Sequence, residues 1–517
     1  MTGIDLHHSS QVACRPVHSK RLFNSKIHRG KDMVFLKKLG HQVFLVLLAL
    51  MLIFNADSSM VNANSNEQKV DFHEETITFV SGTGEYRETL HGTVLIPNQV
   101  GRKAGIVLAH GSGVGDPGKG GNQTDIRKEA EVFARAGIIT LIYNKRSKGY
   151  SKTNRSYELL AQDLIAGVKF LQTRSDIDNK KVGVWGLSEG GWVAPLAASQ
   201  TDDIAFVITS GAPGISPAQQ QTWNMENRLR HQGVQSTSAI HSLVYNGAGV
   251  VFSLSGSEAT YNPVPPLQKI HQPFLAIWGS KDRQVPPAES AEIFKNALDK
   301  AGNRNYVLQF IEGADHSIYN NTDDGFVSLK TLYPGYAEAM TSWLFHVIND
   351  QPPVAQTVGQ TPVQMSNSLT DLTTVHWYDY YWFQLGISVL FLLVFIGCNF
   401  VSIKDRLKKI TKAPSSIQRL AGWTALTGMI SILSFWMYLI SLWMNGGRDI
   451  GWVIVGIPFL WIVIQLLATI TAVLIILLII SCLKNQRKQQ TSARVKWILY
   501  VGIPFIPWSI YWHLLFF

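Results

Sequence analysis

The sequence predicts a mixed α/β domain, built on a mostly parallel sheet, that is followed by an all-α membrane region. Between residues 64 and 350, short β-rich runs alternate with helical patterns, which is typical of a sheet with helices on both faces. Beyond residue 377 the chain consists mainly of long apolar segments. The formal net charge also differs between the parts of the chain. It is +6 for residues 1–40 and +9 for residues 377–517, but −5 for residues 41–376. The basic excess therefore belongs to the membrane-flanking parts and does not indicate nucleic-acid binding.

Residues 1–63 are predicted to be an N-terminal extension and a signal peptide. Lys37 and Lys38 precede the apolar run 43–54, which is too short to cross a bilayer of about 30 Å as a helix. Small residues before the predicted cleavage site, after Ala63, fit the requirement of a signal peptidase. An uncleaved N-terminal anchor is the alternative, and Met33 is an alternative start of the chain.

The α/β domain, residues 64–350, is predicted to hold eight strands with helices between them. Each strand run is short and rich in β-branched or aromatic residues, as expected for strands in a βα repeat. The expected strands are 77–79, 88–97, 105–109, 138–143, 182–186, 205–210, 274–278 and 306–311. The expected helices are 125–136, 157–173, 190–199, 288–301 and 335–349.

Two stretches depart from this alternation. Residues 215 to about 254 are helical and Gln-rich, and they are predicted to form a cap over the sheet edge. In that cap, Trp223, Met225 and Leu229 are expected to line an acyl pocket. Residues 351–376 begin with a stretch rich in Pro, Gln, Thr and Ser and are predicted to be a linker.

A glycine-flanked serine follows the strand 182–186. The segment reads Gly-Leu-Ser-Glu-Gly, with Gly186 and Gly190 two residues before and after Ser188. Such spacing suits a sharp strand-to-helix turn that holds a serine hydroxyl clear of the sheet, because only small residues avoid a clash there. The sequence therefore predicts Ser188 as a catalytic nucleophile, with the helix that starts near Glu189 pointing its N-terminus at the developing negative charge.

An acid and then a base follow the serine along the chain, each just after an apolar strand, and they supply the partners that a serine nucleophile needs. Asp282 comes just after the strand 274–278, and His316 just after the strand 306–311. His316 is expected to take the serine proton and later return it to the leaving group, while Asp282 fixes the tautomer of the imidazole. Asp315 is the rival acid, but residues adjacent in sequence rarely bring a carboxylate to the neighbouring ring nitrogen.

The loop after the strand 105–109 is the expected source of a second oxyanion donor. Its small residues allow backbone N–H groups to approach a substrate oxygen. We assign the oxyanion hole to the N–H groups of Ser112, or alternatively Gly111, and of Glu189.

The same loop contains the spacing of a dinucleotide-binding fingerprint, at Gly113, Gly115 and Gly118. We reject that interpretation, since Pro117 lacks an N–H and the helix does not begin until about residue 125. No cofactor and no metal are expected. The predicted catalytic domain holds no cysteine, because the three in the chain are Cys14, Cys398 and Cys482.

Over about residues 70–350 the chain resembles the α/β-hydrolase superfamily, and more closely its bacterial carboxylesterase and serine aminopeptidase-like group, with dienelactone and prolyl-oligopeptidase-type relatives. In that group one motif commonly has Asp and Gly where this chain has Asn144 and Ser147, which affects a loop beside the site and not the triad. The C-terminal membrane tail is an addition to the usual pattern. The matching segments are 110–113, 143–151, 186–191, 210–213, 279–282 and 313–317.

The C-terminal region is predicted to hold four transmembrane helices. The connections 402–420 and 484–496 are strongly basic, whereas 445–451 contains one Arg and one Asp. By the positive-inside rule the basic connections are cytoplasmic, which places the α/β domain outside the cell membrane in a multi-pass protein. This orientation agrees with the predicted signal peptide. The expected spans are 381–401, 421–444, 452–483 and 497–517.

These features predict an exported, membrane-anchored serine hydrolase that cleaves an ester, thioester or amide through an acyl-enzyme. An aminopeptidase or an acyltransferase is the alternative within this class. The rival is a transport or sensing module in which the hydrolase-like domain is a binding head. Transport is disfavoured because the spans hold no Asp, Glu, Lys or Arg in their apolar interiors. The expected partners are a small-molecule or short-peptide acyl substrate, the lipid bilayer and a membrane protein bound through the tail, but no nucleic acid.

Overall fold

The structure is a computed structural model of the chain. The predicted signal peptide, its cleavage site after Ala63 and most of the two basic connections lie outside the residues that it describes. Gly115, Pro117 and Gly118 of the rejected fingerprint lie outside them as well. The described residues are 72–113, 121–151, 154–254, 257–364, 366–368, 376–407, 415–485 and 492–516.

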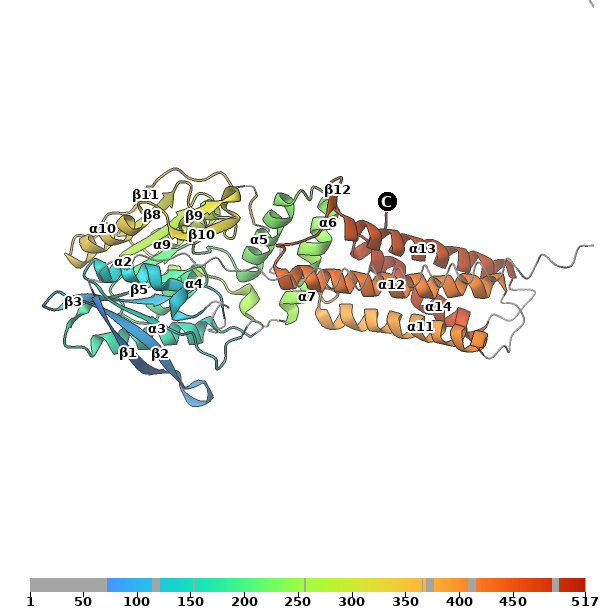
Figure 1. The fold of residues 1–517 in the computed structure, drawn as a ribbon, viewed down its shortest axis with the longest axis horizontal. Coiled ribbons are helices and arrows are strands. Elements are labelled where there is room, and N and C mark those ends of the chain that lie inside the picture. Colours follow the sequence, from blue (N-terminus) through green and yellow to red (C-terminus); the bar gives the residue numbers. More distant parts are fainter. Residues whose placement is uncertain are drawn as a thin grey trace, which may run out of the picture. The chain divides into compact units, whose positions relative to one another are not determined.

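A nine-stranded sheet forms the centre of the α/β domain (Figure 1). Its order is β1-β2-β4-β3-β5-β6-β7-β8-β11, and all neighbours from β4 to β11 are parallel. Strands β1 and β2 pair antiparallel with each other, and β2 pairs antiparallel with β4. The strands are β1 Phe72–Ser81, β2 Glu88–Pro97, β3 Lys103–Ala109, β4 Ile139–Tyr143, β5 Ile177–Leu187, β6 Val207–Ser210, β7 Phe274–Gly279, β8 Tyr306–Ile311 and β11 Gln356–Val358.

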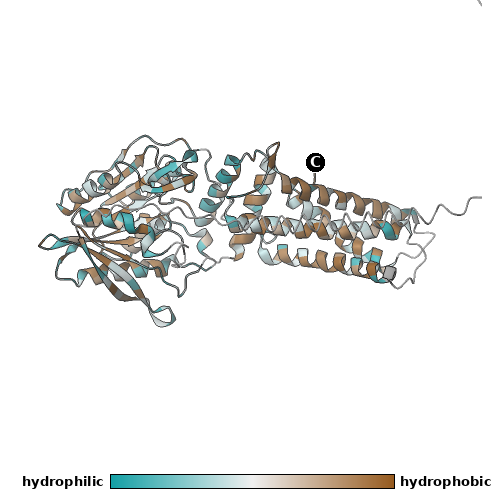
Figure 2. Ribbon diagram, viewed as in Figure 1, coloured by the Kyte–Doolittle hydropathy of each residue, from teal (hydrophilic) through white to brown (hydrophobic). Residues whose placement is uncertain are grey.

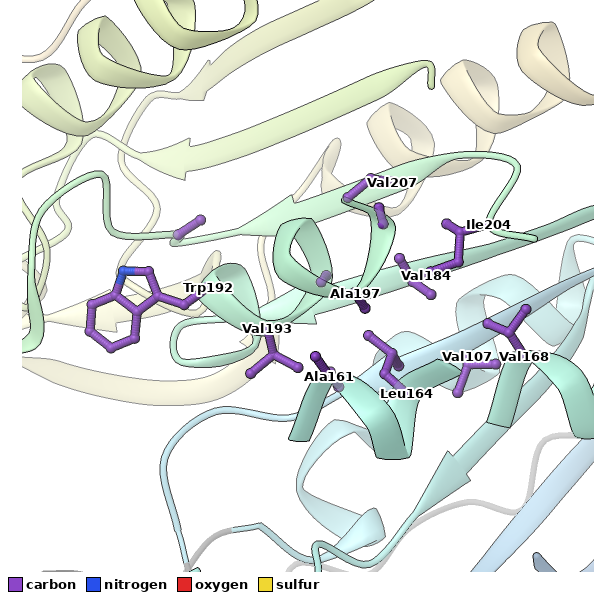
Figure 3. Close-up of a cluster of buried hydrophobic side chains, with 14 of the residues drawn as sticks. Val107, Ala161, Leu164, Val168, Val184, Trp192, Val193, Ala197, Ile204 and Val207 are labelled. Carbon is purple, nitrogen blue, oxygen red and sulfur yellow. The ribbon is translucent and has the colours of Figure 1, made fainter. Parts of the chain in front are cut away.

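Apolar side chains cover both faces of this sheet, because successive residues of a strand point to opposite sides. On one face, Val107, Val184 and Val207 contact α3 (Tyr157–Gln172) and α4 (Gly190–Ala198), as Figure 3 shows. On the other face, their strand neighbours form a second core with α2 and α10. The remaining helices that cover the two faces are α2 Arg127–Arg135, α8 Val264–Leu267, α9 Pro287–Lys300 and α10 Tyr336–Ile348.

The sheet has one strand more than the eight predicted. The ninth, β11, comes from the segment expected to be a linker and pairs parallel with β8. Further along this segment, the Ser368 hydroxyl donates to Glu289 at 2.5 Å. Part of the predicted linker is therefore attached to the α/β domain. A small hairpin, β9 Tyr319–Thr322 and β10 Val327–Leu332, was also not expected.

The predicted cap is helical, but two of its apolar residues do not face the expected pocket. Met225 and Leu229 are fully buried in one apolar cluster with the C-terminal helices, and both lie against Gly447. Trp223 donates from its indole to the Ser366 carbonyl at 2.9 Å. A helix pattern shows which face is apolar but not which element covers that face. The cap consists of α5 Pro217–His231, α6 Thr237–Ile240, η3 His241–Asn246 and α7 Gly247–Leu254.

Four helices follow, namely α11 Tyr381–Leu407, α12 Ser416–Asn445, α13 Phe459–Asn485 and α14 Ala493–Tyr511. Three of them contain a segment long and apolar enough to cross a membrane: 381–404, 416–445 and 459–484. Hydrophobic residues dominate these helices, whereas in the α/β domain they gather on the strands (Figure 2). Many large apolar side chains of the bundle are exposed, among them Leu393, Phe400, Met437 and Ile440. That distribution suits a lipid-facing surface.

The fourth expected span forms α14, which is not among the three candidates. With 19 residues it is long enough, but it is less apolar, because it contains Pro504 and Pro507 and begins with Arg494 and Lys496 close together. Helix α14 nevertheless runs beside α11. Near one end the Cys398 thiol approaches the Arg494 carbonyl, and near the other Tyr511 donates to Asp379 at 2.7 Å. Helix α14 therefore extends over most of the length of α11.

Candidate active site

Ser188 lies at the turn between β5 and α4 in a backbone conformation that is rare for residues other than glycine, with φ of 54°. The tight turn depends on neighbouring glycines. A side chain at Gly186 would lie 2.0 Å from the Gly190 carbonyl oxygen, and one at Gly190 would lie 2.4 Å from the Ala109 carbonyl oxygen. The sequence motif is thus a consequence of the close approach of β3, β5 and α4.

Asp282 and His316 come together at the carboxyl end of the sheet. His316 donates from Nδ1 to Asp282 Oδ2 at 2.8 Å. The other oxygen, Asp282 Oδ1, accepts from the backbone N–H groups of Gln284 and Val285 at 2.8 and 2.9 Å. Both catalytic candidates are buried. The carboxylate is therefore held by three donors and aims one oxygen at the imidazole.

The rival acid, Asp315, has different partners. Its Oδ1 accepts from the N–H groups of Ser317 and Tyr319 at 2.9 and 2.8 Å. This carboxylate shapes the loop that carries His316 and makes no hydrogen bond with the ring. Among the described residues, Asp282 is the acid that contacts the imidazole.

The end of β6 lies between the serine and the histidine. Ser188 donates its backbone N–H to the Ser210 carbonyl at 2.9 Å. The next residue, Gly211, has φ of 57°, and a side chain there would lie 3.0 Å from His316 Nδ1. Ser188 and His316 therefore flank the same two residues. Within the described part of the chain, no hydrogen bond joins Ser188 Oγ to His316, and apo enzymes often tighten this contact only when substrate binds.

The predicted oxyanion loop lies next to the serine. A side chain at Gly111 would lie 3.4 Å from Ser188 Cβ and 4.0 Å from Ser188 Oγ, and Ser112 is exposed. His110 joins this loop to β4, because its Nε2 donates to the Tyr143 carbonyl at 2.9 Å. Burial lowers the pKa of His110 to about 3, so this imidazole is neutral and serves as a fixed donor.

The side chain of Glu189 is buried in a network that the sequence did not reveal. Lys145 Nζ lies 2.5 Å from its carboxylate, Tyr150 donates to it at 2.7 Å and Arg155 at 2.9 Å. Lys145 Nζ also donates to the Gly111 carbonyl at 2.8 Å. Glu189 thus connects the serine turn to the oxyanion loop through a lysine.

Charge explains why Glu189 is ionised inside the protein. Burial alone would raise its pKa, but the positive charges of Lys145 and Arg155 hold the pKa below the usual range. From the sequence motif we predicted a role only for the backbone N–H of Glu189, as a donor in the oxyanion hole. Its side-chain partners lie 34 to 44 residues away in the sequence, so only the fold brings them together.

The segment 143–151 is fixed by further polar contacts. Arg146 makes a fully buried, two-pronged ion pair with Asp163, at 2.8 and 2.9 Å. Asn144 stands where the carboxylesterase and aminopeptidase-like group commonly has Asp. Its side-chain oxygen accepts from the Gln123 N–H at 3.1 Å. Ser147, where a Gly is common, donates to Glu88 at 2.8 Å. Both departures are accommodated by local hydrogen bonds. Within the described ranges no cluster of His, Cys, Asp or Glu side chains could hold a metal ion.

The fold places residues 72–348 in the α/β-hydrolase class, with the serine turn at the end of a central strand. Within that class, residues 124–339 match the model of the prolyl oligopeptidase family.

Curated relatives include both peptidases and an esterase. A probable dipeptidyl-aminopeptidase B from Aspergillus niger is 23% identical over 232 residues, which cover 43% of this chain and 22% of the relative. The esterase EstD from Thermotoga maritima is 25% identical over 248 residues, which cover 44% of this chain and 57% of that protein. The chain thus spans between about a fifth and three-fifths of these relatives. A solved esterase from Pyrococcus furiosus is 20% identical, with 57% of this chain and 97% of that chain covered and a TM-score of 0.39.

The pH dependence of turnover should report His316. Burial lowers the pKa of this imidazole, but the charge and the hydrogen bond of Asp282 raise it, and the balance lies above 6.5. Only the neutral ring accepts the serine proton, so kcat/KM for a p-nitrophenyl ester should rise with pH through a midpoint above 6.5. Asp282→Asn should reduce the rate roughly 10⁴-fold and move that midpoint to lower pH. Asp315→Asn should move it less, and an equal effect of both substitutions would contradict the assignment.

Replacing Glu189 should test how the oxyanion loop is held. Glu189→Gln leaves the Lys145 ammonium buried without a carboxylate, which should cost about 3–5 kcal/mol of stability and lower kcat through the Gly111 loop. Tyr150→Phe removes one donor and keeps both cations, so its cost should be about 1.5–3 kcal/mol. Urea unfolding and kcat, measured with the full chain in detergent, check both. If Glu189→Gln left kcat unchanged, the proposed link to the oxyanion loop would be wrong.

Proposed function

We propose that the chain is a membrane-anchored serine hydrolase that cleaves a carboxylic ester, thioester or amide through an acyl-enzyme. The observation that carries this proposal is the Asp282–His316 hydrogen bond beside a serine held in a strained turn. Strain of this kind persists only where surrounding structure imposes it, and it is frequent at catalytic residues. The matches to an esterase and to aminopeptidases support the same chemistry.

The mechanism follows from the roles of these groups. Ser188 Oγ forms a bond to the substrate carbonyl carbon while its proton passes to His316 Nε2. The tetrahedral intermediate collapses, the bond to the leaving group breaks, and His316 returns the proton to that group. Water then adds to the acyl-enzyme with His316 again as base, which releases the acid and regenerates the serine. The N–H groups of Glu189 and of Ser112 or Gly111 stabilise the oxyanion in both steps.

We further propose that the α/β domain lies on the extracytoplasmic side of the cell membrane. The cap contacts the start of α11 through Tyr381 and the end of α14 through Trp512. The far ends of the helices carry the basic residues, and by the positive-inside rule that end is cytoplasmic. Those among the described residues are Lys404, Arg406, Arg419, Lys484, Arg494 and Lys496.

Labelling with a fluorophosphonate tests the nucleophile directly. The probe phosphonylates an activated serine, so the wild-type chain in detergent should be labelled and Ser188→Ala should not be. Ser210→Ala provides a matched control, because Ser210 is a nearby buried serine whose hydroxyl bonds to Tyr336. Equal labelling of wild type and Ser188→Ala, or no labelling of the wild type, would contradict the proposal. A panel of p-nitrophenyl esters and aminoacyl amides then distinguishes esterase from peptidase activity.

Cysteine accessibility tests the orientation. In a chain whose Cys14, Cys398 and Cys482 are replaced by alanine, Val100→Cys introduces a thiol on an exposed loop of the α/β domain. Lys496→Cys introduces one at the opposite end of the bundle. A membrane-impermeant maleimide added to intact cells should label the first variant, and should label the second only after the cells are lysed. The reverse pattern would place the catalytic domain in the cytoplasm.

A further inference from the structure

A cavity of about 270 Å³ lies beside the serine turn and is not used by the triad. Arg155, which donates to Glu189, and Trp192, in the first turn of the helix after Ser188, form one wall. Trp192 lies apart from the other labelled core side chains in Figure 3. Polar side chains contribute to its lining as well, among them Gln220, Gln221 and Glu258.

Residues of the cap and of a predicted membrane helix also line the cavity. Phe252 of α7 and Trp443 of α12 both line the cavity, and their rings meet edge-to-face with centroids 5.7 Å apart. Trp443 is fixed from the cap side, because its indole N–H donates to the Leu243 carbonyl at 3.0 Å. Gly247 lies so close to that nitrogen that a side chain there would approach it to 2.5 Å. The membrane region therefore supplies part of the cavity itself.

Trp443 lies at one end of a helix that could span a membrane, where contact with a lipid surface is expected. This helix is α12, and Trp443 lies in its last turn. Exposed apolar side chains mark the same end of the bundle, including Trp377 (62% exposed), Trp382 (55%) and Met444 (84%). Tryptophan side chains favour the boundary between lipid and water.

Resting on the proposed serine hydrolase function, we propose that this cavity receives the acyl chain of an ester embedded in the membrane, and that Trp443 is a specificity-determining residue for it. The rings of Trp443, Phe252 and Trp192 offer apolar contacts to the chain, and Arg155 and Glu258 add charged groups to the same lining. An ester that remains partly in the bilayer needs to insert only its acyl chain into the cavity. The tail is then a component of the substrate site as well as an anchor.

The test compares two fluorogenic esters with the full chain in phosphatidylcholine vesicles. The probes are 4-methylumbelliferyl palmitate, which partitions into the vesicles, and the soluble 4-methylumbelliferyl acetate. Wild type should prefer the palmitate, and Trp443→Ala should lower the ratio of kcat/KM for palmitate to that for acetate at least about tenfold. Trp443→Phe should retain most of that ratio. Trp423→Ala, an exposed tryptophan nearer the other end of α12, should leave it unchanged.

Three outcomes would overturn the inference while leaving the proposed function intact. These are equal loss of both activities in Trp443→Ala, a wild type that does not prefer palmitate, and a wild type that prefers a short aminoacyl amide. Phe252→Ala approaches the same cavity from the cap, so it should also lower the ratio if Trp443→Ala fails to fold. Fluorophosphonate labelling of Ser188 in each variant separates the two proposals. Absence of labelling in the wild type would refute the hydrolase function itself.

Discussion

The left-handed backbone of Ser188 is the constraint on which the site depends. Such a conformation costs of order 1–3 kcal/mol and must be imposed by what surrounds it. Here α4 approaches β5 and β3 so closely that neither Gly186 nor Gly190 can carry a side chain, and the Ser188 N–H is bound to the end of β6. The packing of the parallel sheet therefore sets the orientation of the Ser188 hydroxyl. The same strand ends also bring the loops of Asp282 and His316 to one edge.

The side chain of Glu189 links the serine turn to the loop and the cavity beside it. A carboxylate in this position would be costly to bury alone, but three donors from one loop segment surround it. One of these donors, Lys145, also holds the oxyanion loop, and another, Arg155, borders the cavity beside the turn. One buried charge therefore connects the serine turn, the predicted oxyanion loop and the neighbouring cavity. Because both side chains of the Lys145–Glu189 pair are buried, salt should screen this connection much less than a surface ion pair.

The sequence predicted a feature correctly where the signal is a local residue pattern. It did not predict features that depend on contacts between residues far apart in the chain. The strands 88–97 and 306–311 match β2 and β8 at both ends, because short apolar runs bounded by turns are a strong signal. The strand β11 was missed, since its three exposed residues have no apolar pattern and are held to β8 through the backbone. The role of the Glu189 side chain was missed because Lys145 and Arg155 are far away in sequence. The segment 143–151, on which the family resemblance partly rests, includes Lys145 but not Arg155, and it does not show what either residue contacts.

The cap shows why its attachment could not be inferred from amphipathicity alone. The apolar face of the cap could pack against the α/β domain or against the helix bundle. The free energies of its contacts with each show which of the two holds it more strongly. Full burial of Met225 and Leu229 against the bundle is worth about 1.5–3 kcal/mol for each side chain. Hydrogen bonds such as that from Gln220 to the Gln284 carbonyl, which join the cap to the α/β domain, contribute about 0.5–1.5 kcal/mol each. The cap is therefore energetically part of the bundle, and a motion that widened the cavity would separate it from the α/β domain while leaving Trp443 and Phe252 together.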